Sequence, residues 1–323
     1  MKFRTEITPA PLAERIDYSS EILSLGSCFA DEIASRLCRA KFRVTTSPVG
    51  ILFNPASIAA TLTRFAECRP PQSEEIMSKG DDVWFSLGAH TSLDRPSAEE
   101  AEAALREATE RGCRSLERAD WVILTFGTAW IYTHNASRKV AANCHKLPQS
   151  QFTRSRLSVE DIVAMYRPLF EGVLRDKQMI LSVSPVRHLG DGAEQNSVSK
   201  AILRLAVDAL CEQYENAHYF PAYELLNDDL RDYRFYADDL AHPAHSAVEY
   251  VWEKFSEAAL SKQAQELLPR VLRIVSAAEH RPLNARSAEY AEFCRRNAEA
   301  IDLLPEIDFS EERAFFEQYF SKN

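Results

Sequence analysis

The chain has 323 residues, of which 46% are hydrophobic and 27% charged, a composition typical of a soluble globular protein with one large or two modest domains. Its formal net charge of −10 argues against a nucleic-acid or anionic-membrane surface, and no apolar run reaches the roughly 18 residues of a membrane span. The N-terminus lacks the apolar stretch of a signal peptide, and the seven cysteines are scattered without a CxxC pair, so we expect a cytoplasmic protein without disulfides.

The first chemical signal is a turn between a predicted strand and a predicted helix. The apolar run 22–25 ends at Gly26, Ser27 and Cys28 follow, and apolar residues then recur at helical spacing up to position 37. The turn therefore places two potential nucleophiles at a helix N-terminus, where backbone N–H groups and the helix dipole stabilise a thiolate or a developing oxyanion. The alternative interpretation is an ordinary turn with a buried, inert cysteine.

Strands and helices alternate along the rest of the chain. We expect strands at 42–46, 83–87, 121–127, 178–184 and 218–220, a hairpin of 130–132 with 140–143, a polar loop at 68–80, and helices at 55–65, 97–118, 161–175, 194–215 and 245–261. This alternation predicts a parallel, doubly wound α/β sheet, in which ligand sites lie at the carboxyl ends of the strands. Gly127-Thr128 and Ser184 follow two such strands, so we expect them beside Ser27 and Cys28.

The second chemical signal is Asp239, three residues before His242, in a turn that leads into the last helix covering the sheet. This spacing brings a carboxylate beside an imidazole, and a nucleophile needs a base that is itself oriented by a carboxylate. Taken alone, the pattern is more typical of a capped helix N-terminus beside a surface histidine. Combined with Ser27 and Cys28 at the same sheet edge, it predicts a catalytic set.

Five blocks of the chain resemble the GSCFA family. They are Leu25 to Ala30, Gly127 to Trp130, Asn143 to Lys146, Ser184 to His188 and Asp239 to Pro243. The resemblance covers about residues 20–260 and implies the flavodoxin-like three-layer α/β/α sandwich of the SGNH/GDSL hydrolases, a superfamily of esterases and acyl-acting enzymes. It implies a hydrolase-like domain over 1–262 and a C-terminal helical extension over 263–323.

The resemblance also implies roles for the residues of the first and last blocks. By position, Cys28 takes the place of the superfamily's nucleophile, whereas by residue type the match is Ser27; both stay open and Cys28 is favoured. The closing Asp-x-x-His of the superfamily matches Asp239 and His242, which would orient the base and move the proton.

The superfamily's oxyanion glycine resembles Gly50, with Asn54 nearby, and its Gly-x-Asn resembles Gly127-Thr128, although Ala129 replaces the asparagine. Thr128, Asn143 or a backbone N–H group would have to substitute for it. The family-like blocks further place several polar residues where a substrate could be contacted: His90, His145, Arg187, His188 and Lys200. Arg187 and His188, beside a strand end, are the most attractive pair for holding an anionic group.

We therefore expect an acyl hydrolase or acyltransferase that forms a covalent acyl-enzyme with a small-molecule or carbohydrate ester and needs no metal or organic cofactor. The alternatives are a ligand-binding domain without catalysis, motivated by Ala129, and a Cys–His hydrolase of amides. A hydrogen bond from Cys28 or Ser27 to His242 would favour an enzyme, and a gap of several ångströms would favour binding alone. The helical tail is expected to cover the sheet, close the site or form a homodimer interface.

Overall fold

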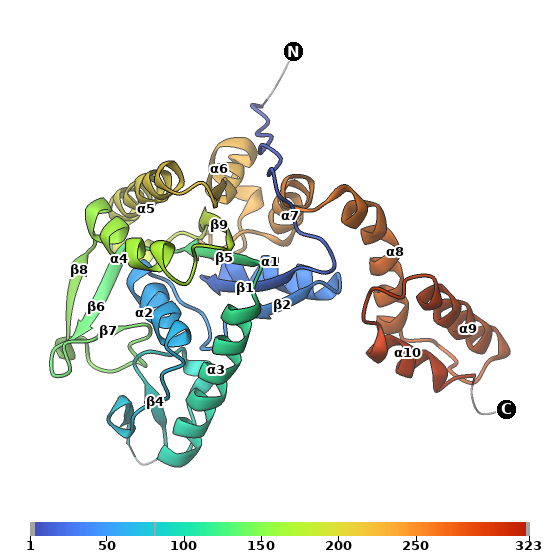
Figure 1. The fold of residues 1–323 in the computed structure, drawn as a ribbon, viewed down its shortest axis with the longest axis horizontal. Helices are drawn as coiled ribbons and strands as arrows, with labels where there is room; N and C mark the ends of the chain where they lie inside the picture. The colour runs from blue at the N-terminus through green and yellow to red at the C-terminus, as the bar shows by residue number, and fades with distance from the viewer. Residues whose placement is uncertain (1–3, 81, 321–323) are drawn as a thin grey trace.

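A five-stranded parallel sheet with the order β10-β9-β5-β1-β2 forms the centre of the computed structural model, which describes residues 4–80 and 82–320 (Figure 1). Its strands are β1 (Glu21–Gly26), β2 (Arg43–Thr46), β5 (Trp121–Phe126), β9 (Gln178–Val183) and β10 (Ala217–Phe220). All four neighbouring pairs are parallel, so the carboxyl ends of the strands meet at one edge. The doubly wound α/β fold is thereby confirmed.

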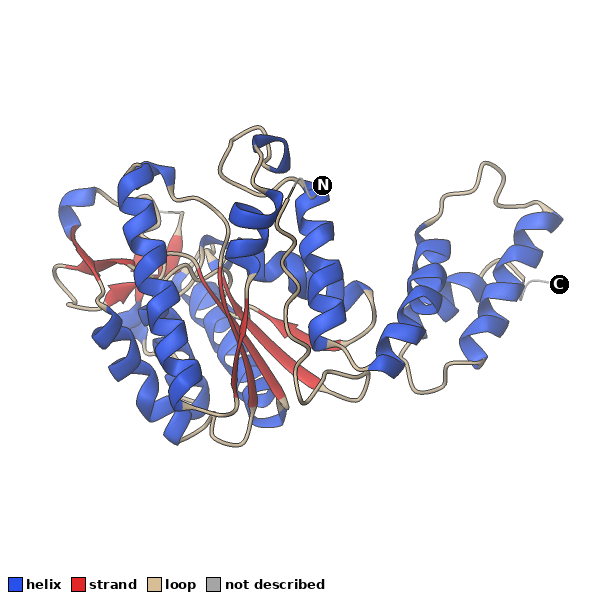
Figure 2. Cartoon of the chain, turned by 90° about the horizontal axis from the view of Figure 1, so that it is seen from above, coloured by secondary structure: helices blue, strands red, loops and turns tan. Residues whose placement is uncertain are grey.

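Helices cover both faces of this sheet and make three layers (Figure 2). One layer holds α1 (Cys28–Arg39) and α7 (His245–Ala259), and the other holds α2 (Pro55–Ala66), α3 (Ala98–Arg118), α4 (Val159–Glu171) and α5 (Ala193–Gln213). Successive residues of β1 alternate between the layers: Ile22 packs with the first and Leu23 with the second. None of the helices in the described ranges combines the length and hydrophobicity of a membrane span.

Two small antiparallel sheets lie outside the central one. β3 (Ile76–Ser78) pairs with β4 (Trp84–Ser86), while β6 (Trp130–His134) lies between β7 (Val140–Ala141) and β8 (Phe152–Arg156). The hairpin of β6 and β7 is confirmed. β3 falls in the expected polar loop, and β8 is almost wholly exposed, so neither strand has the apolar alternation that would have indicated it. A short helix α6 (Ala222–Glu224) and a π-helical turn over Leu225–Leu230 were also not expected.

The C-terminal helices α8 (Lys262–Glu279), α9 (Ala288–Asp302) and α10 (Ser310–Glu317) form a unit beside the β2 edge of the sheet (Figure 1). Ion pairs join Lys41 to Glu312 at 2.8 Å and Arg39 to Glu279 at 2.7 Å. These contacts lie where α1 ends and β2 begins, at the amino edge of the sheet. The tail therefore does not close a site at the carboxyl edge, which was one of its expected roles.

Gly26, the last residue of β1, allows an unusually close approach of β1 to β5. A Cβ atom at this position would lie 2.4 Å from the carbonyl oxygen and 2.9 Å from the amide nitrogen of Thr125. Both atoms belong to the backbone of a central strand, which cannot move aside without breaking its own pairing. The glycine of the turn is therefore required by packing, whatever chemistry the turn performs.

We expect Gly26→Ala to lower the free energy of unfolding by about 2 kcal/mol or more, because overpacking in a tight interior forces backbone shifts. Urea denaturation followed by circular dichroism measures the effect. Gly190→Ala is the matched control, because an added Cβ there has no atom within 4 Å. Equal midpoints for the parent and Gly26→Ala would contradict the close approach of the two strands.

Candidate active site at the carboxyl edge of the sheet

The two potential nucleophiles differ in their access to substrate. Ser27 is the N-cap residue of α1 and is only 1% exposed. Its Oγ is buried and has no hydrogen-bond partner in the part of the chain that the structure describes. Cys28, the first residue of the helix, is partly exposed. Of the two side chains, the thiol is therefore the one that a substrate can reach from the sheet edge.

The Cys28 thiol is protonated at neutral pH. Burial raises its pKa, and this effect outweighs the lowering by the backbone N–H groups of Phe29 and Cys28; Asp31 raises the pKa further and Lys200 lowers it. The backbone N–H groups at the helix N-terminus favour the thiolate, as expected, but desolvation dominates and the pKa is raised overall. A nucleophilic Cys28 needs a base to remove its proton.

Asp239 and His242 form the expected carboxylate–imidazole pair. His242 Nδ1 lies 2.6 Å from Asp239 Oδ2, while Asp239 Oδ1 accepts hydrogen bonds of 2.9 Å from the backbone N–H groups of Ala241 and His242. These two backbone bonds and the imidazole lower the pKa of Asp239 to about 2, so the carboxylate stays ionised. An ionised carboxylate holds the proton of the neutral imidazole on Nδ1 and leaves Nε2 free to act as a base.

Arg187 fastens the loop that carries this pair to the end of β9. Its backbone N–H donates to Ala241 O at 3.0 Å, and its guanidinium carbon lies 4.0 Å from the centre of the Tyr236 ring. The loop is closed further by the N–H of Ala237, which donates to His242 O at 2.8 Å. Arg187 was expected to hold substrate, and the structure instead gives it a positioning role.

A buried lysine lies between the strand ends. Lys200 is 2% exposed, and its Nζ donates hydrogen bonds of 2.6 Å to Gly127 O and 2.7 Å to Ser184 O. Burial lowers its pKa to about 7, against an opposing influence from Cys28. The two acceptors follow β5 and β9, so Lys200 joins the carboxyl ends of these strands beneath the site.

His188 connects the buried lysine to the loop of His242. Burial, together with the charges of Lys200 and His242, lowers the pKa of His188 to about 4. Its Nε2 is buried and has no hydrogen-bond partner among the described residues. A Cβ atom added to Gly127 would lie 3.3 Å from this nitrogen. Lys200 interacts electrostatically with both Cys28 and His188, and His188 interacts with His242. These interactions indicate that the four residues lie in one site.

The expected hydrogen bond between the nucleophile and the base is not formed in the part of the chain that the structure describes. Within residues 4–80 and 82–320, neither the Cys28 thiol nor the Ser27 hydroxyl makes a hydrogen bond to His242. The His242 side chain is 52% exposed and lies in an exposed loop. The site thus holds an oriented base and an accessible thiol that are not yet in contact.

Two of the expected oxyanion donors are already used. The N–H of Gly50 donates to Ser47 O at 2.7 Å, and the N–H groups of Gly127 and Thr128 both donate to Phe53 O, at 2.8 and 2.9 Å. Gly50 and Gly127 are therefore not oxyanion donors in this arrangement, and the expectation is wrong for both. The acceptor, Phe53 O, had no signal in the sequence, because a backbone carbonyl acts independently of its side chain.

Other donors are available at the same edge. The N–H groups of Cys28 and Phe29 open α1 and have no intrahelical acceptor. Asn54 accepts a 2.8 Å hydrogen bond from Ser57 N through Oδ1, which caps α2, while its Nδ2 makes no hydrogen bond to any residue that the structure describes. These three groups could stabilise a developing oxyanion.

A cavity of about 320 Å³ opens beside these groups. Asn54 and His188 line it, together with the aromatic rings of Phe53, Trp130 and Tyr132. Asn143 and Thr128 line it as well, but the Thr128 hydroxyl is held by Ser199 Oγ at 3.2 Å and by Trp130 N at 3.1 Å. The cavity is apolar and carries a few polar groups, as small-molecule sites commonly do.

His145 and His90 hold the chain around the cavity. The buried ring of His145 places Nε2 2.9 Å from Ser86 O and Nδ1 3.0 Å from Asp94 Oδ1, and its backbone N–H donates to Asn143 Oδ1 at 2.8 Å. His90 Nδ1 accepts from the N–H of Ser92 at 3.2 Å. Both histidines were expected to contact substrate. Both ring nitrogens of His145 face protein atoms instead, whereas His90 uses only Nδ1 among the described residues, so the expectation for His90 stays a prediction.

Two family models match the chain, one in its α/β part and one in its helical tail. The sequence model of the GSCFA family matches residues 21–255, and that of the GSCFA domain protein, C-terminal domain, matches residues 271–321. No curated protein matches the chain. The first match includes Cys28 at the start of α1, Lys200 on α5 and the loop of His242, and the second spans most of the helical tail.

Proposed function

The chain belongs to the GSCFA family, and we propose that it is an acyl hydrolase or acyltransferase that forms a thioester on Cys28. The observation that carries this proposal is the 2.6 Å contact between His242 Nδ1 and Asp239 Oδ2, at the sheet edge where the partly exposed thiol of Cys28 begins α1. A protonated thiol beside an oriented imidazole base is the arrangement that acyl transfer to cysteine requires. We further propose that the domain is related to the SGNH/GDSL hydrolases.

The reaction proceeds in two steps. In the first, His242 Nε2 takes the proton of the Cys28 thiol, the sulfur attacks the ester carbonyl carbon, and the C–O bond to the alcohol breaks. His242 returns the proton to the departing alkoxide, and the N–H groups of Cys28 and Phe29, together with Asn54 Nδ2, hold the oxyanion. In the second, water or an acceptor hydroxyl gives its proton to His242 and attacks the thioester, releasing the acyl group and restoring the thiol.

Closure of the His242 loop over the substrate completes the site in this proposal. Catalytic hydrogen bonds are often long or absent without substrate and tighten only in the reacting complex. Small uncharged esters, carbohydrate esters among them, suit the cavity, because aromatic rings and the amides of Asn54 and Asn143 line it. A cytoplasmic location agrees with the seven free cysteines.

Incubation with p-nitrophenyl butyrate, followed by intact-mass and peptide-mapping spectrometry, tests this proposal. We expect a butyryl adduct on Cys28 that is lost in Cys28→Ala and kept in Ser27→Ala. Cys68 is an internal control because its side chain is exposed, so a reagent that acylates cysteines without selection would modify it first. An adduct on Ser27 would identify a serine enzyme, and labelling only at Cys68 would contradict the proposal.

A ligand-binding domain without catalysis is the second candidate, favoured by the open contact between Cys28 and His242. The buried Ala129 adds to this, because its side chain is 0% exposed and cannot replace the missing asparagine. Under this function the ester would bind without turnover and leave no adduct. A p-nitroanilide of the same acyl group tests the amide-hydrolase alternative, which predicts anilide cleavage as well.

A further inference from the structure

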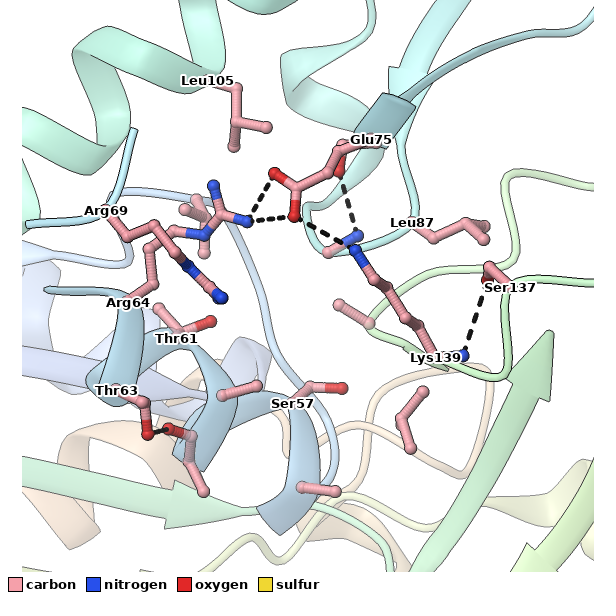
Figure 3. A pocket seen from close by; sticks show the side chains of 18 of the residues that line it. Ser57, Thr61, Thr63, Arg64, Arg69, Glu75, Leu87, Leu105, Ser137 and Lys139 are labelled. Carbon is pink, nitrogen blue, oxygen red and sulfur yellow. Dashed lines mark hydrogen bonds and ion pairs between the residues drawn. The ribbon is translucent and has the colours of Figure 1, made fainter. Parts of the chain in front are cut away.

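A second cavity, larger than the one beside His188, lies on the other side of β7. Its volume is about 560 Å³, and α2 over residues 56–64, the β3–β4 hairpin and residues 137–142 line it (Figure 3). Ala142 lines both cavities. His188 lines only the smaller one, and Cys28 and His242 line neither. The larger cavity is therefore adjacent to the proposed active site but separate from its reacting groups.

Positive charge exceeds negative charge in the walls of this cavity. Arg64, Arg69 and Lys139 line it, against two carboxylates, those of Glu74 and Glu75. Glu75 serves two of the cations, since Arg64 Nη2 lies 2.6 and 2.7 Å from its oxygens and Lys139 Nζ lies 3.4 Å away. One carboxylate shared between two cations leaves an excess of positive charge.

The two arginines retain unused hydrogen-bonding capacity. The Arg64 side chain is only 13% exposed. Its Nη1 is buried and makes no hydrogen bond within residues 4–80 and 82–320. Arg69 has its nearest carboxylate, Glu67, at 3.9 Å, and both of these side chains are about half exposed. Figure 3 draws both arginines on the α2 side of the cavity and Glu75 across from them. A planar anion could bind to the N–H groups of Arg69 with further attraction from Arg64.

Much of the remaining lining is apolar and adaptable, and the hydroxyl groups of Ser57, Thr61, Thr63, Ser86 and Ser137 lie among it. Ala59 and Ala60 present small side chains along α2, Leu105 lines the cavity from α3, and Met77 and Met165 add flexible ones. The volume lies within the range that holds a small organic ligand. An inorganic anion would leave most of this apolar surface uncovered, whereas an uncharged hydrocarbon would leave the excess positive charge of the walls without an anion.

We propose that the larger cavity binds a carboxylic acid with an apolar body, such as a medium-chain fatty acid. The carboxylate pairs with Arg69 and Arg64, and the hydrocarbon packs on α2 and the two methionines. The proposal does not rest on the acyl-transfer function, since binding here requires neither Cys28 nor His242. The two proposals can therefore fail separately.

Isothermal titration calorimetry of the full chain with octanoate, and with 1-octanol as the uncharged analogue, tests this inference. We expect octanoate to bind at least about tenfold more tightly than 1-octanol, because its carboxylate forms charge-assisted hydrogen bonds with the arginines that an uncharged hydroxyl cannot form. Arg69→Met should weaken octanoate binding about tenfold. Arg114→Met is the matched control, because Arg114 is 60% exposed and does not line the cavity.

A variant that fills the cavity separates this site from the smaller one. Ala60 is exposed on the helix surface that faces the cavity, so Ala60→Phe adds volume there without disturbing the core, and it should abolish octanoate binding. Octanoate that fails to bind, binds no better than 1-octanol, or binds equally well to Arg69→Met and Ala60→Phe overturns the proposal. If the parent protein forms no acyl adduct, the proposed enzyme is rejected. If octanoate nevertheless binds to the parent, and Cys28→Ala leaves this binding intact, the inference about the larger cavity is supported.

Discussion

Replacement of His242 by glutamine is expected to lower the rate of Cys28 acylation by about 10³-fold at neutral pH, the usual contribution of a general base. The size of the effect follows from the state of the thiol. Burial raises the pKa of Cys28, so hardly any thiolate exists without a base to take the proton. Appearance of the butyryl adduct with time, measured by mass spectrometry, gives the rate in the parent and in the variant.

The pH dependence distinguishes a base from a residue that only shapes the site. As the pH rises towards the raised pKa of Cys28, the thiolate forms by itself, so the deficit of His242→Gln should shrink. His245→Gln is the matched control, because His245 lies three residues further on and its side chain is 84% exposed. An unchanged rate in His242→Gln with a large loss in His188→Gln would identify His188 as the base instead.

Substitution of Lys200 by methionine is expected to lower the free energy of unfolding by about 2–4 kcal/mol at pH 9. Its amino group donates to Gly127 O and Ser184 O in the interior, and a buried carbonyl that loses its donor costs about 1–3 kcal/mol. Denaturant unfolding of parent and variant at the same pH measures the loss. A matched control is Lys177→Met, because Lys177 also donates to a backbone carbonyl, Ala119 O at 2.9 Å, but from a partly exposed position.

The difference between parent and Lys200→Met should depend on pH in a defined direction. The pKa of Lys200 is about 7 in the folded protein and about 10.5 in the unfolded chain, so the unfolded chain binds more protons between these values. The stability that Lys200 contributes is therefore greatest above that window and falls as the pH drops towards 7. Comparing the two proteins at pH 6, 8 and 9.5 cancels the titration of groups that do not interact with Lys200. A difference that is constant with pH would show that burial does not shift this titration.

The pairing of Asp239 with His242 was predictable because it is local. Three residues separate the two side chains, and the turn between them closes on itself through backbone N–H groups that donate to the carboxylate. The order of apolar strands and amphipathic helices was equally predictable, since alternation and helical spacing are written in consecutive residues. β3 and β8 escaped prediction because β3 has only three residues and β8 is almost wholly exposed, so neither shows the apolar alternation of a half-buried strand.

The oxyanion donors could not be predicted, because their availability depends on long-range backbone contacts. Gly127 follows the strand as expected, yet its N–H is used by Phe53 O, which lies 74 positions earlier and carries no motif. Gly50 likewise uses its N–H within a turn. Resemblance identifies a position, but the hydrogen-bond partner of a backbone N–H is decided by the neighbouring chain.

The sequence by itself determined the fold class, the family and the placing of Cys28 at a helix start, because these depend on patterns within short windows. The tertiary structure alone decided that the Ser27 hydroxyl is buried and the Cys28 thiol accessible. It also decided that burial outweighs the helix N-terminus, so that the pKa of the thiol is raised. It also brought Lys200 beneath two strand ends and built the arginine-lined cavity on α2. Burial and charge at a site are sums over residues far apart in the chain, so they exist only once the layers have packed.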